Sequence, residues 1–198
     1  MTTTTREGLR PLMISTRPIS PDGLTTVPLG RTHDLRIIRR PHDGSFVIPG
    51  DPIVHPLMTR FLAELTRLAP AELTAGAAFM RCLPPGPTTA NETHRDRDNR
   101  ATNFVCMVTG EDDELSRQHE FFADDDPWEQ QPIIVANGHL IGFTKHLHRR
   151  PTRPAGTGPR VFLSASLWHS ASDVPPLPTT AEPYTCHGTP VAEMAGAR

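Results

Sequence analysis

The sequence predicts a mainly β protein, a sandwich or a barrel, with one helix ahead of the strands. Six short apolar runs between residues 77 and 168 are separated by Pro, Gly, Asn and Asp, a pattern typical of such folds. Proline accounts for 22 of the 198 residues, about twice the usual share of roughly 5%. Because proline lacks a backbone N–H and breaks helices, this composition argues against a helical bundle. The length and an apolar content of 36% fit one domain with one core.

The elements follow in order along the chain. Residues 1–23 are rich in Thr and Pro without periodicity, so we expect a flexible N-terminal arm. A helix is predicted from residue 56 to residue 68, because Pro56 suits a first turn, Pro70 ends the pattern, and four apolar side chains recur on one stripe. These four are Leu57, Phe61, Leu65 and Leu68.

The six apolar runs are the predicted strands. They are residues 77–83, 103–109, 119–122, 132–136, 139–144 and 161–168. Residues 171–198 repeat the Pro-rich character of the start and are expected to form a tail. One domain is therefore predicted over residues 24–170, with its β core at about 77–168.

Composition excludes several classes of function. A net charge of −2 and the absence of a basic patch argue against nucleic acid as a partner. No apolar run approaches the roughly 20 residues that cross a bilayer, and the first residues lack the apolar core of a signal peptide. We expect a cytoplasmic protein with a small-molecule partner and no membrane; the sequence indicates no oligomeric state. Three cysteines without a C-x-x-C pair exclude a disulfide scaffold.

A candidate metal site begins at His94 and Asp96. Residues i and i+2 of an extended segment point to the same side, so an imidazole and a carboxylate can face one ion. A third ligand is expected from residues 138–148, which contain His139, His146 and His148. Two nitrogens and one carboxylate leave three positions open on an octahedral ion, as in non-haem Fe(II) oxygenases. The alternative is that His94 and Asp96 belong to a solvated turn.

The order of these features resembles the Fe(II)- and 2-oxoglutarate-dependent dioxygenases: H-x-D, then a distal histidine after a Gly-initiated strand, then an arginine twelve residues later. The resemblance covers residues 77–168 and implies a double-stranded β-helix, a distorted, cupin-like jelly roll with flanking helices. It implies His148 as the distal ligand, with His146 as the second choice. The positions that follow the family pattern are Gly138, Leu140, Phe143, Leu147, His148 and Arg149, with one residue fewer than usual before Leu147.

The resemblance also implies roles in the last strand. Arg160 matches the family position that pairs with the far carboxylate of 2-oxoglutarate. If Arg160 points into the barrel, alternation turns Phe162, Ser164, Ser166 and Trp168 inward as well. The hydroxyls of Ser164 and Ser166 are then expected to support the cosubstrate, although satisfied core hydroxyls are an equal alternative.

Residues 92–96, after a Pro-rich turn at 84–87, resemble the small bacterial dioxygenases that hydroxylate free amino acids. Arg97 stands where that group usually has Gly. This resemblance implies Fe(II), 2-oxoglutarate and O2, with hydroxylation of an unactivated C–H bond and release of succinate and CO2. The candidate substrate contacts are Glu92, Arg81, His146 and Trp168. Two alternatives are the same chemistry on a peptidyl, carrier-bound or specialised-metabolite substrate, and a cupin-like metal or ligand-binding protein without oxygenase activity.

Overall fold

The computed structural model describes residues 11–19, 32–41, 43–50, 55–83, 93–96, 100–109, 120–122, 131–149 and 158–176. These ranges contain, in chain order, β1 (Met13–Ile14), β2 (Thr32–Arg39), α1 (Pro56–Leu68), β3 (Ala75–Leu83), β4 (Thr102–Thr109), β5 (Glu120–Phe122), β6 (Ile133–Ile134), β7 (Leu140–Phe143), β8 (Leu147–Arg149), β9 (Arg160–Trp168) and a short 3-10 turn, η3 (Ala171–Asp173). The predicted helix is confirmed at both ends, and each of the six predicted strands is present.

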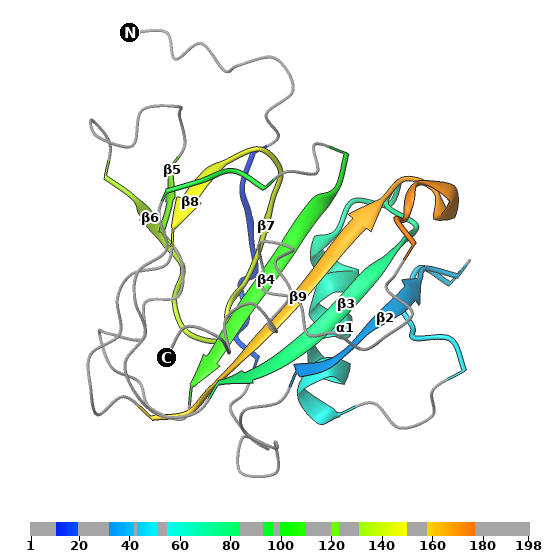
Figure 1. Ribbon diagram of the computed structural model, residues 1–198, viewed down its shortest axis with the longest axis horizontal. Helices are drawn as coiled ribbons and strands as arrows, with labels where there is room; N and C mark the ends of the chain where they lie inside the picture. Colours follow the sequence, from blue (N-terminus) through cyan, green and yellow to red (C-terminus); the bar gives the residue numbers. More distant parts are fainter. Residues whose placement is uncertain are drawn as a thin grey trace, which may run out of the picture.

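The strands form two antiparallel sheets (Figure 1). The larger sheet has the order β1-β7-β4-β9-β3-β2, and the smaller sheet has the order β6-β5-β8. An isolated bridge between His94 and His148 adds the segment at residues 93–96 to the free edge of β8. From β3 to β9 the chain therefore passes repeatedly between the two sheets, which is the winding of a jelly roll. The predicted double-stranded β-helix is confirmed by this strand order.

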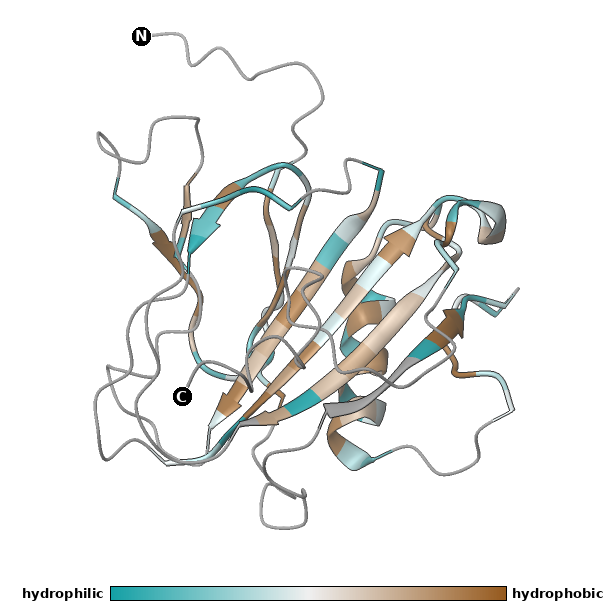
Figure 2. Ribbon diagram, viewed as in Figure 1, coloured by the Kyte–Doolittle hydropathy of each residue, from teal (hydrophilic) through white to brown (hydrophobic). Residues whose placement is uncertain are grey.

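Alternate residues of β9 face opposite sides of the larger sheet. Val161, Leu163, Ala165 and Leu167 belong to the core cluster that includes the buried residues of α1. Phe162 belongs to a second cluster, together with Phe121 of the smaller sheet. We call the first side the outer face and the second the inner face. The alternation predicted for this strand is confirmed, and Figure 2 shows hydrophobic residues along the length of β4 and β9.

Helix α1 covers the outer face of the larger sheet (Figure 1). The Nδ1 atom of His55 accepts a hydrogen bond from the backbone N–H of Leu57 at 3.2 Å, which satisfies one of the donors that a helix start leaves open. Phe61 and Leu65 are fully buried against the sheet. The helix thus closes one face and leaves the inner face to the smaller sheet.

Part of the expected N-terminal arm is built into the fold. Met13 and Ile14 pair with Gly142 and Ile141 of β7, and the N–H of Ile19 donates to the carbonyl of Gly138 at 2.7 Å. The close approach depends on Gly142, because a Cβ there would lie 2.5 Å from the Phe104 ring and 2.9 Å from the methyl carbon of Met13. The Thr- and Pro-rich composition of residues 1–23 does not indicate these contacts. Residues 1–10, 20–23 and 177–198 lie outside the described residues.

Candidate metal centre

His94, Asp96 and His148 come together as the sequence predicts. One ligand atom from each lies within 4.8 Å of the other two, and the Nε2 atom of His148 is 3.6 Å from Oδ1 of Asp96. The backbones of His94 and His148 hold each other through two hydrogen bonds, each with an N···O distance of 3.0 Å. Two side chains far apart in the sequence are thus fixed by one β-bridge. We call the three residues the triad.

The imidazole of His148 has a defined orientation. Its Nδ1 atom is 3.0 Å from the carbonyl oxygen of His146, and because a carbonyl accepts only, Nδ1 carries the proton and donates. The lone pair is then on Nε2, the atom that faces Asp96. The rings of Phe121 and Phe143 pack against the imidazole, with centroids 5.5 and 4.9 Å away. An outer hydrogen bond of this kind is what orients histidine ligands in metal sites.

The carboxylate of Asp96 is tied to the larger sheet. Its Oδ2 atom accepts a hydrogen bond of 2.5 Å from the Nδ2 atom of Asn103. The Oδ1 atom of Asn103 in turn accepts a hydrogen bond of 2.6 Å from the hydroxyl of Ser166. Burial raises the pKa of Asp96 to about 6, against the opposing effects of His94 and the Asn103 hydrogen bond. The group is therefore mainly ionised at neutral pH.

The donor set fits a divalent transition metal. Two imidazole nitrogens and one carboxylate oxygen on one side of an ion leave several coordination positions open. Within the part of the chain that the structure describes, the ligand atoms of these three side chains are close enough to bind one ion. Asn103 and Ser166 were not predicted as partners of Asp96, because their contact depends on strand register.

Arg160 is the first residue of β9 and is 5% exposed. It shares the inner face with Phe162, Ser164 and Ser166 by alternation. Ser166 is six positions further along β9, which corresponds to roughly 20 Å between Cα atoms at about 3.3 Å per residue. Arg160 thus lies at the end of the inner face away from the triad, and buried Ser164 lies between them.

The other predicted residues differ in depth. Arg81 is half-buried and stands opposite Phe162 in the register of β3 and β9, so it is diagonal to Arg160. Trp168 is buried at the opposite end of β9. Glu92 lies outside the described residues.

The remaining histidines take different places. His146 is 3% exposed, and burial together with the charge of Arg95 lowers its pKa. Its Nδ1 atom is buried without a hydrogen-bond partner among the described residues. His139 holds the N-terminal segment instead, with Nδ1 2.8 Å from the carbonyl oxygen of Ser15. His146 therefore lies near the triad through its neighbour His148, and His139 has a separate structural contact.

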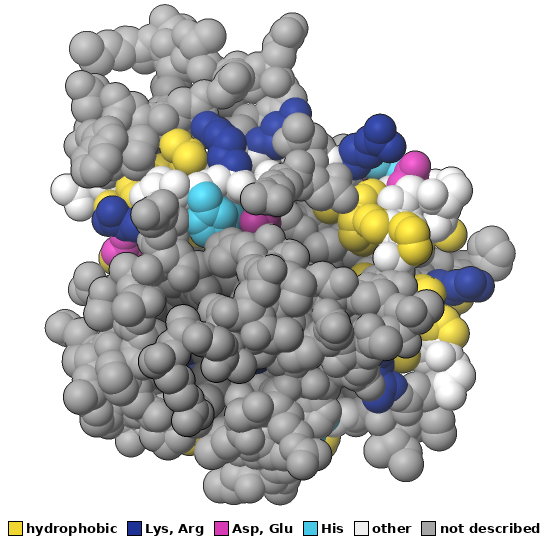
Figure 3. All heavy atoms as spheres, in the orientation of Figure 1, with side chains coloured by type: hydrophobic (Ala, Val, Ile, Leu, Met, Phe, Trp, Pro, Cys, Tyr) yellow, Lys and Arg dark blue, Asp and Glu magenta, His cyan; other side chains and the backbone are white. Residues whose placement is uncertain are grey.

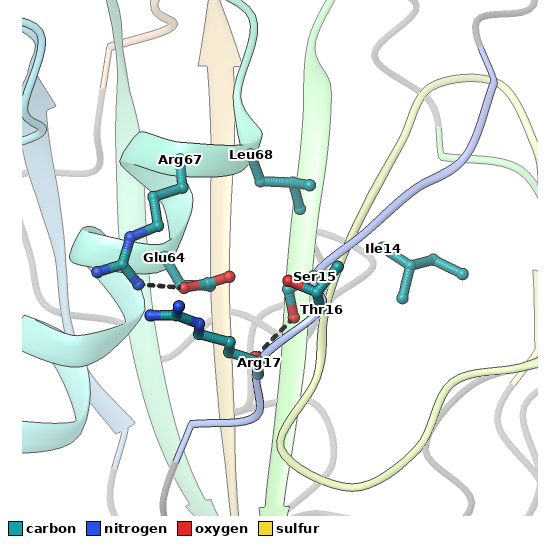
Figure 4. A pocket seen from close by; sticks show the side chains of 7 residues that line it. All are labelled: Ile14, Ser15, Thr16, Arg17, Glu64, Arg67 and Leu68. Carbon is teal, nitrogen blue, oxygen red and sulfur yellow. Dashed lines mark hydrogen bonds and ion pairs between the residues drawn. The ribbon is translucent and has the colours of Figure 1, made fainter.

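A separate pocket of about 370 Å³ lies between β1 and α1 (Figure 4). Glu64 and Arg67 form an ion pair of 2.8 Å in its wall. The lining shares no residue with the triad; it consists of Ile14, Ser15, Thr16, Arg17, Glu64, Arg67 and Leu68. In Figure 3, described basic side chains gather in the upper part of the face shown, next to a histidine and an acidic side chain. No helix among the described residues is long and apolar enough to span a membrane.

No model of a protein family matches the chain, and no curated protein sequence is significantly similar to it. Among solved structures, a prolyl-4-hydroxylase from Pseudomonas putida matches with a TM-score of 0.48 and 16% identity, over 81% of this chain and 93% of the other. An oxidoreductase of the 2OG-Fe(II) oxygenase family from Burkholderia pseudomallei matches with a TM-score of 0.38 and 16% identity, over 73% and 70%.

The ribosomal oxygenase YcfD from Escherichia coli matches with a TM-score of 0.38 and 15% identity, and the match spans 94% of this chain but only 62% of that protein. With TM-scores below 0.5 and identities of 15 to 16%, the fold assignment depends on the strand order given above.

Proposed function

We propose that this protein is an Fe(II)- and 2-oxoglutarate-dependent dioxygenase. The observation that carries the proposal is the triad, which presents two imidazole nitrogens and a carboxylate within 4.8 Å of one another. His94, Asp96 and His148 would hold Fe(II), and 2-oxoglutarate and O2 would be cosubstrates. Bound Fe(II) would supply oxidative chemistry with these two cosubstrates: 2-oxoglutarate is converted to succinate and CO2 with uptake of one oxygen atom of O2, and the other oxygen atom enters a substrate C–H bond.

The chain's own residues position the reactants. Three protein ligands leave room on an octahedral ion for the two oxygens of a keto acid and for O2. Arg160 would pair with the far carboxylate of 2-oxoglutarate, since a guanidinium offers two parallel donors to a carboxylate. Its burial strengthens this ion pair, because few water molecules screen it. The hydroxyl of Ser164, between Arg160 and the triad, would donate to the same cosubstrate.

The inner face also keeps water away from the reacting centre. One buried apolar cluster occupies the inner face around the triad and toward Arg160. It includes Val105, Met107, Phe121, Phe143 and Phe162. An apolar wall of this kind prevents side reactions with water. Because Asp96 would supply a carboxylate oxygen to the ion, its position would not be open to chloride, and we propose hydroxylation rather than halogenation.

For the substrate we propose a free amino acid. The support is the resemblance of residues 92–96 given above, with Glu92 as a partner for the ammonium group. His146 and Trp168 would line the space near the triad. The fourth candidate contact, Arg81, stands diagonal to Arg160, and we propose that it adds positive charge at the carboxylate-binding end.

An anaerobic titration tests the reaction class. The purified protein receives Fe(II) and then 2-oxoglutarate, and visible absorption reports the chelated keto acid. We expect a charge-transfer band for the wild type and none for His148→Ala. For Arg160→Ala we expect normal metal binding with affinity for 2-oxoglutarate at least 10-fold lower, because a buried bidentate pair is lost. Metal binding without any band in the wild type would favour the cupin-like binding protein instead.

A second measurement tests the substrate. Succinate release is followed with a panel of free amino acids, with the same residues in short peptides, prolyl peptides included, and with carrier-bound acids. We expect a free amino acid to stimulate release and to gain one oxygen atom by mass spectrometry. Stimulation by peptides or carrier-bound acids alone would overturn the substrate proposal and leave the reaction class intact.

A further inference from the structure

We propose that Asn103 is a positioning residue that makes Asp96 a ligand through one oxygen only. This inference rests on the proposed function, since it assigns a role in the same metal site. Asn103 is the second residue of β4 and is 8% exposed. It connects Asp96 to Ser166 of β9 through the two hydrogen bonds of 2.5 and 2.6 Å.

The fold places Asn103 for this task. Asn103 stands directly opposite Ser166 in the register of β4 and β9, so both side chains point to the inner face. Both strands belong to the centre of the larger sheet. The carboxylate of Asp96, which comes from a short segment before β4, is thus fixed to two central strands of the larger sheet.

The chemistry of the three groups fixes the direction of each hydrogen bond. An ionised carboxylate only accepts, so the amide of Asn103 must turn its NH2 group toward Asp96. Its carbonyl oxygen then faces Ser166 and accepts from the hydroxyl. Ser166 therefore prevents the amide from turning over, and the donor toward Asp96 is maintained.

The consequence falls on the metal. Asn103 holds Oδ2 of Asp96. The other carboxylate oxygen, Oδ1, faces the histidines and is 3.6 Å from Nε2 of His148. An ion bound there takes one oxygen from Asp96. A carboxylate released from Asn103 is able to rotate and to bind through both oxygens, which would occupy a position that 2-oxoglutarate or O2 needs.

The chain offers a matched control in Asn137. Its amide also makes two hydrogen bonds to β4, since Oδ1 accepts from the N–H of Thr109 at 2.9 Å and Nδ2 donates to the carbonyl of Thr109 at 3.2 Å. Thr109 is at the end of β4 away from Asn103. Asn137→Ala therefore removes an amide of the same type and a comparable pair of bonds without touching Asp96.

The test uses Co(II), which binds without redox chemistry and reports its coordination by visible absorption. The whole chain is titrated with Co(II) alone as wild type, Asn103→Ala, Ser166→Ala, Ser166→Thr and Asn137→Ala. Loss of an outer-shell partner typically lowers metal affinity about 10- to 100-fold, and we expect that range for Asn103→Ala together with a changed Co(II) spectrum. We expect a smaller loss for Ser166→Ala, recovery in Ser166→Thr, and wild-type affinity and spectrum for Asn137→Ala.

The outcomes separate this inference from the proposed function. Unchanged Co(II) affinity and spectrum in Asn103→Ala, with the wild type binding normally, would overturn the role of Asn103 and leave the proposed function standing. Equal losses in Asn103→Ala and Asn137→Ala would show a structural role alone and would also overturn it. Absence of Co(II) binding by the wild type would instead contradict the proposed metal site. Circular dichroism of each metal-free variant checks that it is folded.

Discussion

In the proposed metal site, protonation of Asp96 would compete with metal binding. Burial raises the pKa of this carboxyl group in the metal-free protein to about 6, above the ordinary value of about 3.9. Below pH 6 protons compete with a metal ion for Asp96. The Co(II) affinity is therefore expected to fall by about 10-fold for each pH unit below 6 from this group alone. A Co(II) titration at pH values from 5 to 7.5 measures the slope.

The same pKa has the opposite effect on the stability of the metal-free protein. The folded state binds a proton more tightly than the unfolded state, so the contribution of Asp96 is most favourable below about pH 4 and becomes unfavourable as the pH rises through about 6. Urea unfolding of the metal-free protein across this range checks the sign. Asp96→Asn is the control, since it has no proton to release and should lack this component of the decline. A decline of the same size in Asp96→Asn would assign it to other groups.

At the scale of single residues, His94 and Asp96 were predictable because their chemistry and spacing are visible in the chain. The choice of His148 among three nearby histidines came from the family resemblance. Asn103 and Ser166 were not predictable as partners of Asp96. One is an asparagine at the start of a strand and the other a serine in a mostly apolar strand, and neither type is distinctive there. Their contact arises from the register of β4 and β9, which no local pattern specifies.

Phe61 of α1 and Phe121 of β5 lie on opposite faces of the larger sheet, and the two faces have different roles. Phe61 of α1 and Phe121 of β5 are both fully buried. Phe61 belongs to the cluster on the outer face, whereas Phe121 stacks on the imidazole of His148 with an interplanar angle of 23°. The elements on the outer face therefore stabilise the fold, and those on the inner face also orient the imidazole of His148, a proposed metal ligand.

A matched pair of substitutions tests this division. Phe61→Leu and Phe121→Leu are each expected to lower the free energy of unfolding by less than about 1.5 kcal/mol, the usual cost of a similar-sized apolar replacement. Only Phe121→Leu should weaken Co(II) binding, by about 2- to 10-fold, which corresponds to the 0.5 to 1.5 kcal/mol of an aromatic pair. Unfolding in urea and Co(II) titration give the two quantities. Equal effects of both variants on Co(II) affinity would contradict the division.

At the scale of elements, the helix and the strands β3, β4 and β9 were predictable because their apolar patterns extend over many residues. β2 was not predicted, although it has eight residues. β8 was not predicted as a strand; it has three residues, Leu147–Arg149, and exists because β5 pairs with it on one side and His94 on the other. β1 has two residues and depends on the space left by Gly142. Short strands of this kind are defined by their partners rather than by their own composition.

Over the whole molecule, the triad lies where the two sheets are linked. His94 and His148 belong to the edge of the smaller sheet, while Asp96 is tied through Asn103 to the larger one. A metal ion bound at the proposed site would therefore cross-link the sheets and would bind the folded state alone. Co(II) at 100 times its dissociation constant is expected to add about 2.7 kcal/mol to the free energy of unfolding, and EDTA should remove this gain. Urea unfolding measures it, and a gain that persists in His148→Ala would place the ion elsewhere.

Two buried thiols allow the stabilisation by Co(II) to be measured without denaturant. Burial raises the pKa of Cys82 to about 11 and raises that of Cys106 above its ordinary range, and both side chains are at most 1% exposed on the outer face. A thiol reagent therefore reaches them only when the protein opens, and because the thiolate is the reactive form, the raised pKa slows the reaction further.

If that opening is global, the Co(II) concentration that adds about 2.7 kcal/mol should slow labelling of the two thiols by about 100-fold. The Cys186→Ser variant leaves only these two thiols to follow. A rate unaffected by Co(II), in a protein that Co(II) does stabilise against urea, would show that α1 separates from the sheet while the two sheets remain linked at the triad.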